Sequence, residues 1–158
     1  VIGSVEEQLQ KLLEVGNSLG LNCIRYCDYE VELWNKLKQK IWDSHRKTEI
    51  ICKIGVMPNQ AVETLNQVAL ETGLGLIHAG SGLGELHFNS VNPETILELR
   101  QWCESIGGFL TVLAAPLEIK QKLDVWGYNQ NGLDIMRRIK QKFDPQNILN
   151  PHSFVGGI

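Results

Sequence analysis

The 158-residue chain contains no CxxC pair and no long apolar run, and each absence excludes a class of protein. Without paired spacing, its four cysteines (Cys23, Cys27, Cys52 and Cys103) do not indicate a zinc site or a disulfide framework. They are typical of small thiols in a reduced, intracellular protein. No apolar stretch approaches the roughly 20 residues that a transmembrane helix needs, so we expect a protein that does not span a membrane.

The sequence also lacks an excess of basic residues. Lys and Arg number 15 against 18 Asp and Glu, which gives a net charge of −3, and the basic residues are scattered. Proteins that bind nucleic acid usually gather cations on one face to neutralise phosphates, so we expect no nucleic-acid partner. The chain begins at Val1 without an initiating Met, and we expect it to be a piece of a longer polypeptide.

Hydrophobic periodicity predicts four strands and two helices between residues 49 and 114. Pro58 and Pro93 suit the first turn of a helix, where a missing amide hydrogen costs no hydrogen bond. Gly73 and Gly107 mark the ends of these two helices. The expected order is strand 49–57, helix 58–72, strand 74–79, strand 85–89, helix 93–106 and strand 109–114.

This order is the split βαβ arrangement of a ferredoxin-like α+β fold, with both helices on one face of an antiparallel sheet. We expect an added helix–strand–helix before it, with the strand at residues 22–26 lying at one sheet edge. A last helix is expected at 132–142. The length suits one core, so residues 1–158 are expected to form a single domain.

The glycine-rich segment at residues 80–84 has two interpretations. A phosphate-binding loop requires a helix directly after the glycines, with its first amides aimed at the anion. The residues that follow alternate as in a strand, which favours a tight hairpin turn between strands 74–79 and 85–89.

Two histidines flank that segment, and their role stays open. His78 and His87 lie on the two arms of the expected hairpin, so their imidazoles are candidates to face each other and bind a metal. Glu85 is the nearest candidate for a third ligand. The alternative is that both histidines are hydrogen-bonded residues of the sheet, and we predict no metal site.

The basic side chains can be either solvated or in contact with a bound anion. Lys53 lies within the apolar strand 49–57, where its ammonium must reach solvent, a carboxylate or a bound anion. The basic run at 137–142 is typical of a solvated helix end rather than of a binding patch. No spacing of Ser, His, Asp or Cys indicates a nucleophilic centre, so we assign no catalytic residue.

Three segments of the last third carry a family resemblance. They are Asp124-Val125-Trp126-Gly127, the run from Met136 to Pro151 that contains Asp-Pro-Gln-Asn-Ile-Leu-Asn-Pro at 144–151, and Phe154-Val155-Gly156-Gly157. Together they resemble the end of FAD-linked oxidases of the vanillyl-alcohol oxidase class. Within that class the chain is most similar to the FAD-binding subunits of glycolate oxidases.

The resemblance implies the C-terminal domain of a larger flavoprotein, which covers the FAD isoalloxazine and shapes a pocket for a small 2-hydroxy acid such as glycolate. An N-terminal FAD-binding domain, absent here, would hold most of the cofactor, and other oxidase subunits would receive the electrons. The implied location is cytoplasmic, with membrane association only through partner subunits. We expect the isolated fragment to be inactive and to bind FAD weakly at most.

The resemblance also suggests site residues. Related 2-hydroxy-acid dehydrogenases carry two metal-binding histidines followed by an asparagine near the substrate, and His78, His87 and Asn89 echo that pattern. We therefore take Lys53, His87 and Asn89 as candidate substrate contacts. Asn150, in the segment that returns toward the flavin domain in this family, is a candidate cofactor contact.

The C-terminal motif also has a purely structural interpretation. Asp144-Pro145 ends the last helix, and Ile148 and Leu149 are expected to anchor the chain in the core. The alternative function for the whole chain is a non-catalytic ferredoxin-like module that binds a small ligand or another protein, because this fold hosts many activities.

Overall fold

The structure is a computed structural model that describes residues 2–26, 30–42, 49–69, 73–128 and 132–158. The chain divides into two compact units, Val1–Asp43 and Ser44–Ile158. The first unit contains the helices α1 (Ile2–Ser18) and α2 (Glu30–Trp42). The guanidinium of Arg25 binds both carboxylate oxygens of Glu6, at 2.5 and 2.8 Å, and so ties the segment after α1 to its first turns.

The prediction of a strand at residues 22–26 is wrong. Residues 21–26 form no regular element and pair with no described strand. Apolar residues alone do not make a strand, because its backbone amides and carbonyls need a partner ladder. Ile24 and Tyr26 are correspondingly exposed rather than packed.

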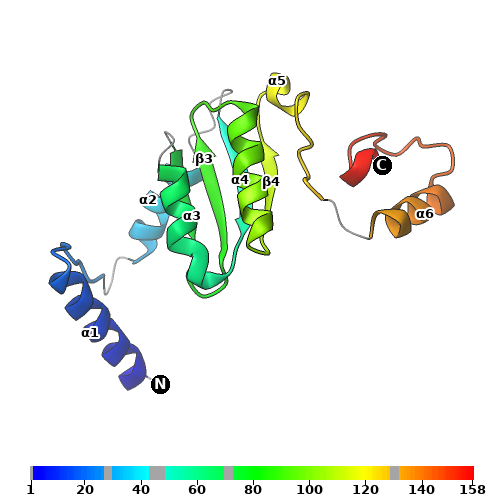
Figure 1. Cartoon of the computed structure of the whole chain (residues 1–158). Coiled ribbons are helices and arrows are strands. Elements are labelled where there is room, and N and C mark those ends of the chain that lie inside the picture. The colour runs from blue at the N-terminus through cyan, green and yellow to red at the C-terminus, as the bar shows by residue number, and fades with distance from the viewer. Residues whose placement is uncertain (1, 27–29, 43–48, 70–72, 129–131) are drawn as a thin grey trace. The chain divides into compact units, whose positions relative to one another are not determined.

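The second unit contains the expected four-stranded sheet (Figure 1). Its strands are β1 (Ile50–Gly55), β2 (Gly73–Ile77), β3 (Leu83–Phe88) and β4 (Phe109–Ala114). The sheet order is β2-β3-β1-β4, and every neighbouring pair is antiparallel. The helices α3 (Ala61–Ala69) and α4 (Pro93–Ser105) lie together on one side of this sheet in Figure 1. The α+β prediction with ferredoxin-like topology is therefore confirmed.

Both prolines begin helical structure, as the sequence indicates. Pro58 starts the short 3-10 turn η1 (Pro58–Gln60), which leads directly into α3. Pro93 is the first residue of α4. At each place the ring fixes a helical φ and replaces an amide that has no partner within the helix.

The core lies between the sheet and the two helices. Alternate strand residues point toward the helices, because successive side chains of a strand face opposite ways. Ile54 and Leu86 are fully buried there, and Ile96 of α4 packs over them. The buried thiols of Cys52 and Cys103 belong to the same cluster, and Cys27 lies outside the described residues.

Three short or amphipathic elements complete the second unit: α5 (Leu117–Lys120), α6 (Leu133–Phe143) and the 3-10 turn η2 (Val155–Gly157). The helix α6 matches the helix expected at 132–142, and none of its residues is buried. Among the helices that the structure describes, none is both long and apolar enough to cross a bilayer.

Candidate functional site

Polar side chains gather on the side of the sheet opposite α3 and α4, which we call the far face. Ile50, Cys52 and Ile54 of β1 point into the core, so the residues between them point to the far face. By the same alternation and register, the far face carries Lys53 from β1, Glu85 and His87 from β3, and Thr111 from β4.

The strand register brings the predicted residues Lys53 and His87 together. Lys53 is the Cα partner of Glu85 on β3, and His87 lies two residues further along that strand. The Nε2 atom of His87 is 3.6 Å from Oε2 of Glu85. Lys53 is exposed, so its ammonium is free to move over this part of the face.

His87 is the most unusual of these side chains. It is only 9% exposed, and within the described part of the chain neither ring nitrogen has a hydrogen-bond partner, the Glu85 carboxylate at 3.6 Å being its nearest ion-pair partner. A buried polar group without a partner costs about 1–3 kcal/mol relative to one that is hydrogen-bonded. A hydroxyl or a carboxylate that reached the ring could hydrogen-bond either nitrogen.

Asn89 lies just beyond the last residue of β3 and is exposed. It is two residues past His87, so it extends the far-face row of β3 past the end of the sheet. Lys53 and His87 are thus neighbours on paired strands, whereas Asn89 stands at the strand terminus.

The two hairpin histidines do not face each other. His78 donates its amide to the carbonyl of Leu83 at the turn, whereas His87 is the Cα partner of Leu74 near the other end of β2. Four residues of strand separate these positions, which is about 13 Å. His78 instead bonds Ser81, with Nδ1 2.9 Å from Oγ. The interpretation as a facing metal-binding pair is wrong.

The glycine-rich segment is a hairpin turn, as the alternation after it favours. The strand β3, not a helix, follows the glycines. Gly82 has a φ of +71°, and a Cβ there would overlap the carbonyl oxygen of Val56. The Gly82 carbonyl accepts a hydrogen bond from the Val56 amide at 3.0 Å, so the turn is fastened to the end of β1. The phosphate-loop interpretation is wrong.

The C-terminal motif is organised around the carboxylate of Asp144. It accepts hydrogen bonds from the amides of Ile148 and Leu149, both at 2.9 Å, and pairs with the ammonium of Lys140 at 2.6 Å. The hydrogen bond from Lys140, followed by that from the Ile148 amide, lowers the pKa of Asp144 to about 2. The motif therefore encodes a polar clamp that turns the chain back after α6.

The expectation that Ile148 and Leu149 anchor the chain in the core is wrong, because each is 68% exposed. Their amides, rather than their side chains, are fixed. Leu149 and Asn150 line an apolar groove of about 480 Å³ beside α6. Asn150 has a φ of +44°, and its contact with a cofactor stays a prediction.

A second cavity was not identified from the sequence. It has a volume of about 510 Å³ and lies where the end of α4, the strand β4 and residues 126–128 meet. Phe109 and Thr111 line it from β4, and Trp126 and Tyr128 line it from the segment after α5. Alternation along β4 places Phe109 and Thr111 on one face, but only the strand register shows that Lys53 is on the same face.

The fold and the C-terminal clamp define an α+β domain whose far face carries polar residues among exposed apolar ones such as Leu74 and Leu76. Residues 120–153 match the family model described as FAD linked oxidases, C-terminal domain. Neither the curated proteins nor the solved structures yielded a match to this chain. The family match supports a C-terminal domain of a flavin-linked oxidase, and it implies FAD as the cofactor of full-length members.

The described residues offer no suitable site for the pyrophosphate of FAD. Gly80 to Gly84 form a hairpin, and the groove that contains Asn150 is lined mainly by apolar side chains, so neither suits a pyrophosphate. The far face, with the ammonium of Lys53 and the buried imidazole of His87, has groups that can hydrogen-bond a small acid.

Proposed function

We propose that this chain is the C-terminal domain of an FAD-dependent subunit of a 2-hydroxy-acid oxidase, most similar to that of glycolate oxidase. Its far face binds a small 2-hydroxy acid. An upstream domain would hold the FAD, which when bound would supply hydride acceptance from the CH–OH carbon while the hydroxyl proton leaves to water, and other subunits would receive the electrons. We place the assembly in the cytoplasm, with any membrane contact made by partner subunits.

The observation that carries this proposal is the buried imidazole of His87, diagonal to Lys53 on the paired strand, whose nitrogens have no hydrogen-bond partner among the described residues. Lys53 binds the substrate carboxylate through a charge-assisted hydrogen bond, and His87 hydrogen-bonds the adjacent hydroxyl. Lys53 and His87 are diagonal neighbours, about 7–8 Å apart at their backbones, a separation that the long lysine side chain lets the two adjacent polar groups of a 2-hydroxy acid bridge.

The remaining predicted residues have supporting roles in this proposal. Asn89, at the exposed end of β3, closes one side of the substrate site with its amide. Asn150 contacts the cofactor from the C-terminal segment, which the family match covers. No catalytic base is assigned, and no metal ion takes part.

The test is an NMR titration of the whole chain with glycolate, following the amide signals of Lys53, Glu85 and His87. We expect saturable shifts centred on these residues. Lys53→Met and His87→Phe should each weaken binding by about tenfold or more, the loss expected for a charge-assisted hydrogen bond. Lys122→Met, at an exposed lysine outside the far face, is the matched control and should bind normally.

Acetate, which lacks the hydroxyl, should bind the unaltered chain more weakly than glycolate does. The His87→Phe variant should bind acetate and glycolate with equal affinity. Shifts that are confined to another surface, or none at millimolar glycolate, would contradict the proposal. Such an outcome would favour the alternative of a non-catalytic module.

A further inference from the structure

The sheet has two edge strands, β2 and β4, and contacts within the chain cover the edge at β4. The amide of Val112 on β4 donates to the carbonyl of Val125 at 2.8 Å. The Nε atom of Arg100, a buried side chain of α4, donates to the carbonyl of Leu110 at 3.1 Å. Backbone groups that β4 directs away from the sheet are therefore already bonded.

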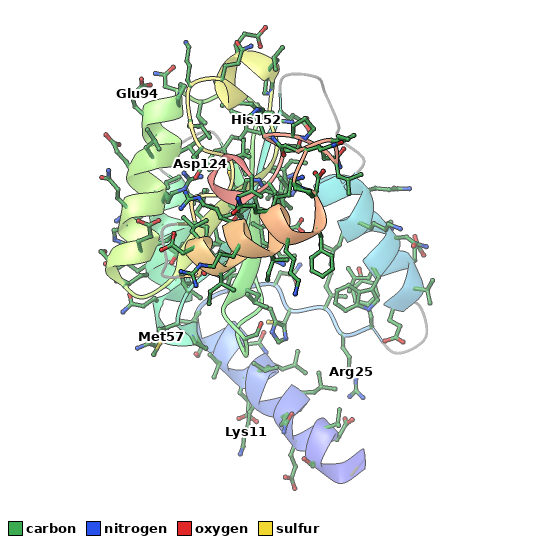
Figure 2. All side chains as sticks on the ribbon, turned by 90° about the vertical axis from the view of Figure 1, so that its right-hand side faces the viewer. Lys11, Arg25, Met57, Glu94, Asp124 and His152 are labelled. Carbon is green, nitrogen blue, oxygen red and sulfur yellow. The ribbon has the colours of Figure 1, made fainter. Side chains whose placement is uncertain are left out.

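The segment that covers β4 is itself fixed by hydrogen bonds. Asp124, labelled in Figure 2, accepts bonds from the amides of Trp126 and Gly127 at 3.0 and 3.1 Å. The Thr111 hydroxyl donates to the carbonyl of Trp126 at 3.1 Å. The guanidinium of Arg100 lies so close to Gly127 that a Cβ there would overlap it. Another strand cannot pair with β4 without displacing these contacts.

The opposite edge strand, β2, has no such cover in the part of the chain that the structure describes. Among the described strands, its only neighbour is β3. Proteins usually protect an exposed edge with lysine, proline or a bulge. The five residues of β2, Gly-Leu-Gly-Leu-Ile, include neither lysine nor proline, and their pairing with β3 is regular. The edge at β2 is therefore open to another strand.

The ladder between β2 and β3 shows which backbone groups of β2 point outward. The His78 amide, just past the end of β2, donates to the Leu83 carbonyl at 2.8 Å. Bonded positions alternate in an antiparallel pair, so residues 74 and 76 also direct their amides and carbonyls toward β3. Residues 73, 75 and 77 direct theirs away from the sheet. Such a row is complementary to the backbone of another extended strand.

The side chains of β2 suit contact with an identical strand. Gly75 faces α3, because a Cβ at this position would overlap the side chain of Leu65. Leu74 and Leu76 therefore point to the far face, where each is 47% exposed. The strand carries no charged residue, so two copies can approach without repulsion between like charges.

We propose that β2 pairs antiparallel with β2 of a second copy of this chain, about a twofold axis at Gly75. In this register the two Gly75 residues exchange hydrogen bonds, and Gly73 pairs with Ile77 of the second copy. Leu74 then lies opposite Leu76 of the second copy, at the closer spacing of a pair without hydrogen bonds. The half-exposed leucines of both copies cover one another, and the two sheets become one.

The distribution of side chains favours a second copy over a strand of another kind. In a row across the joined sheet, Leu76 of one copy is next to Leu74 of the other. Glu85 and His87, their partners on β3, lie outside this pair. The junction is thus apolar with a polar rim, as in stable protein interfaces, and the twofold contact is self-complementary. Because a short strand pair buries little area, we expect a reversible dimer.

Sedimentation equilibrium of the whole chain tests the association. We expect a monomer–dimer equilibrium in which the dimer fraction rises with protein concentration. Leu74→Lys and Leu76→Lys should each weaken dimerisation by about two- to thirtyfold, because each change removes a leucine from both symmetric pairs. Leu113→Lys, at an exposed leucine on the covered edge strand β4, is the matched control and should dimerise normally.

Disulfide trapping tests the register. In a Cys23→Ser and Cys27→Ser background, a mixture of Leu74→Cys and Leu76→Cys chains should form disulfide-linked dimers, because these positions face each other across the axis. Either variant alone should link more slowly, because identical positions lie diagonal to each other, about 7–8 Å apart. Non-reducing electrophoresis over time measures both rates.

A chain that stays monomeric at every concentration would overturn this inference. So would a dimer that is unaffected by Leu76→Lys, since another surface would then hold it together. Equal linkage in the mixed and single samples would contradict the twofold register. The inference does not rest on the proposed function: a monomer that shows the glycolate-induced shifts at Lys53 sinks only the dimer.

Discussion

The sheet and the C-terminal segment (residues 124–158) use apolar side chains in opposite ways. Phe88 of β3 is 1% exposed in the core, whereas Phe143 at the end of α6 is 77% exposed. The sheet is held by burial between strands and helices. The turn after α6 is held by the polar clamp of Asp144, Lys140 and two amides.

The difference lies in how apolar residues are covered. The sheet buries one apolar face against α3 and α4 but leaves Leu74, Leu76 and Leu113 exposed on the far face, and the C-terminal segment leaves Ile139, Phe143 and Leu149 uncovered. A contiguous exposed apolar surface usually marks an interaction site. The segment with that surface overlaps the part matched by the FAD-linked oxidase model.

The largest test of this contrast compares two phenylalanines. Phe88→Ala should lower the free energy of unfolding by about 3–5 kcal/mol, the usual loss for a buried aromatic. Phe143→Ala should change it by less than about 0.5 kcal/mol, as for an exposed side chain. Urea melts of both variants measure the difference, and similar losses would show that Phe143 is packed.

A pair of glycines tests how the hairpin is fastened to the sheet. Gly82 and Gly107 both have positive φ, at +71° and +77°, but only at Gly82 would a Cβ overlap the backbone of Val56. Gly107→Ala should cost about 1–2 kcal/mol from backbone strain alone. Gly82→Ala should cost about 1–3 kcal/mol more because of the overlap. Equal losses in denaturant melts would mean that the hairpin moves aside freely.

The polar clamp should make the C-terminal segment sensitive to acid. The hydrogen bond from Lys140 lowers the pKa of Asp144 from 3.8 to about 2 in the folded chain. A carboxyl with a lowered folded pKa contributes its full stabilisation above its unfolded pKa and loses it as the pH falls. Protection of the Ile148 and Leu149 amides from hydrogen exchange should therefore decrease between about pH 4 and pH 2.

Asp144→Asn should remove most of that pH dependence and weaken protection at neutral pH. Asp134→Asn, at an exposed carboxylate near the start of the same helix, is the matched control. If protection is the same at pH 5 and pH 2, the clamp does not depend on the carboxylate.

The smallest expected effect concerns the thiols of the sheet core. Burial raises the pKa of Cys52 to about 12 and that of Cys103 to about 11, so almost no thiolate forms near neutral pH. In a Cys27→Ser background, iodoacetamide should modify the half-buried Cys23 first and reach the core thiols only on unfolding. Mass spectrometry over time measures this order. Early modification of Cys103 would indicate local opening of α4.

The fold was largely predictable because its signals are local. Several local signals agree along residues 49–114: alternating apolar residues in the strands, two prolines at helix starts and glycines at helix ends. The failures arose where local pattern was taken for tertiary contact. Ile24 has apolar neighbours in the sequence but pairs with none of the strands that the structure describes, and Ile148 is apolar yet exposed because the fixed groups there are backbone amides.

The candidate site was only partly predictable for the same reason. Lys53 and His87 stood out as polar residues in apolar strands, which is a property of each strand alone. Their adjacency depends on the β1–β3 register, and the separation of His78 from His87 depends on the β2–β3 register. A shift by one residue would move each side chain to the other face, so single-strand patterns do not determine such pairings.

By itself, the sequence determined the α+β class, the order of strands and helices in the sheet unit, and the resemblance of the C-terminal segment to FAD-linked oxidases. Only the tertiary structure decided that His87 is buried with no hydrogen-bond partner among the described residues and that the cavity lined by Thr111 adjoins Lys53. The physical reason is the sequence separation of the interacting residues. Secondary structure follows from neighbours along the chain, whereas a site is formed by side chains that the strand register and packing bring together across the fold.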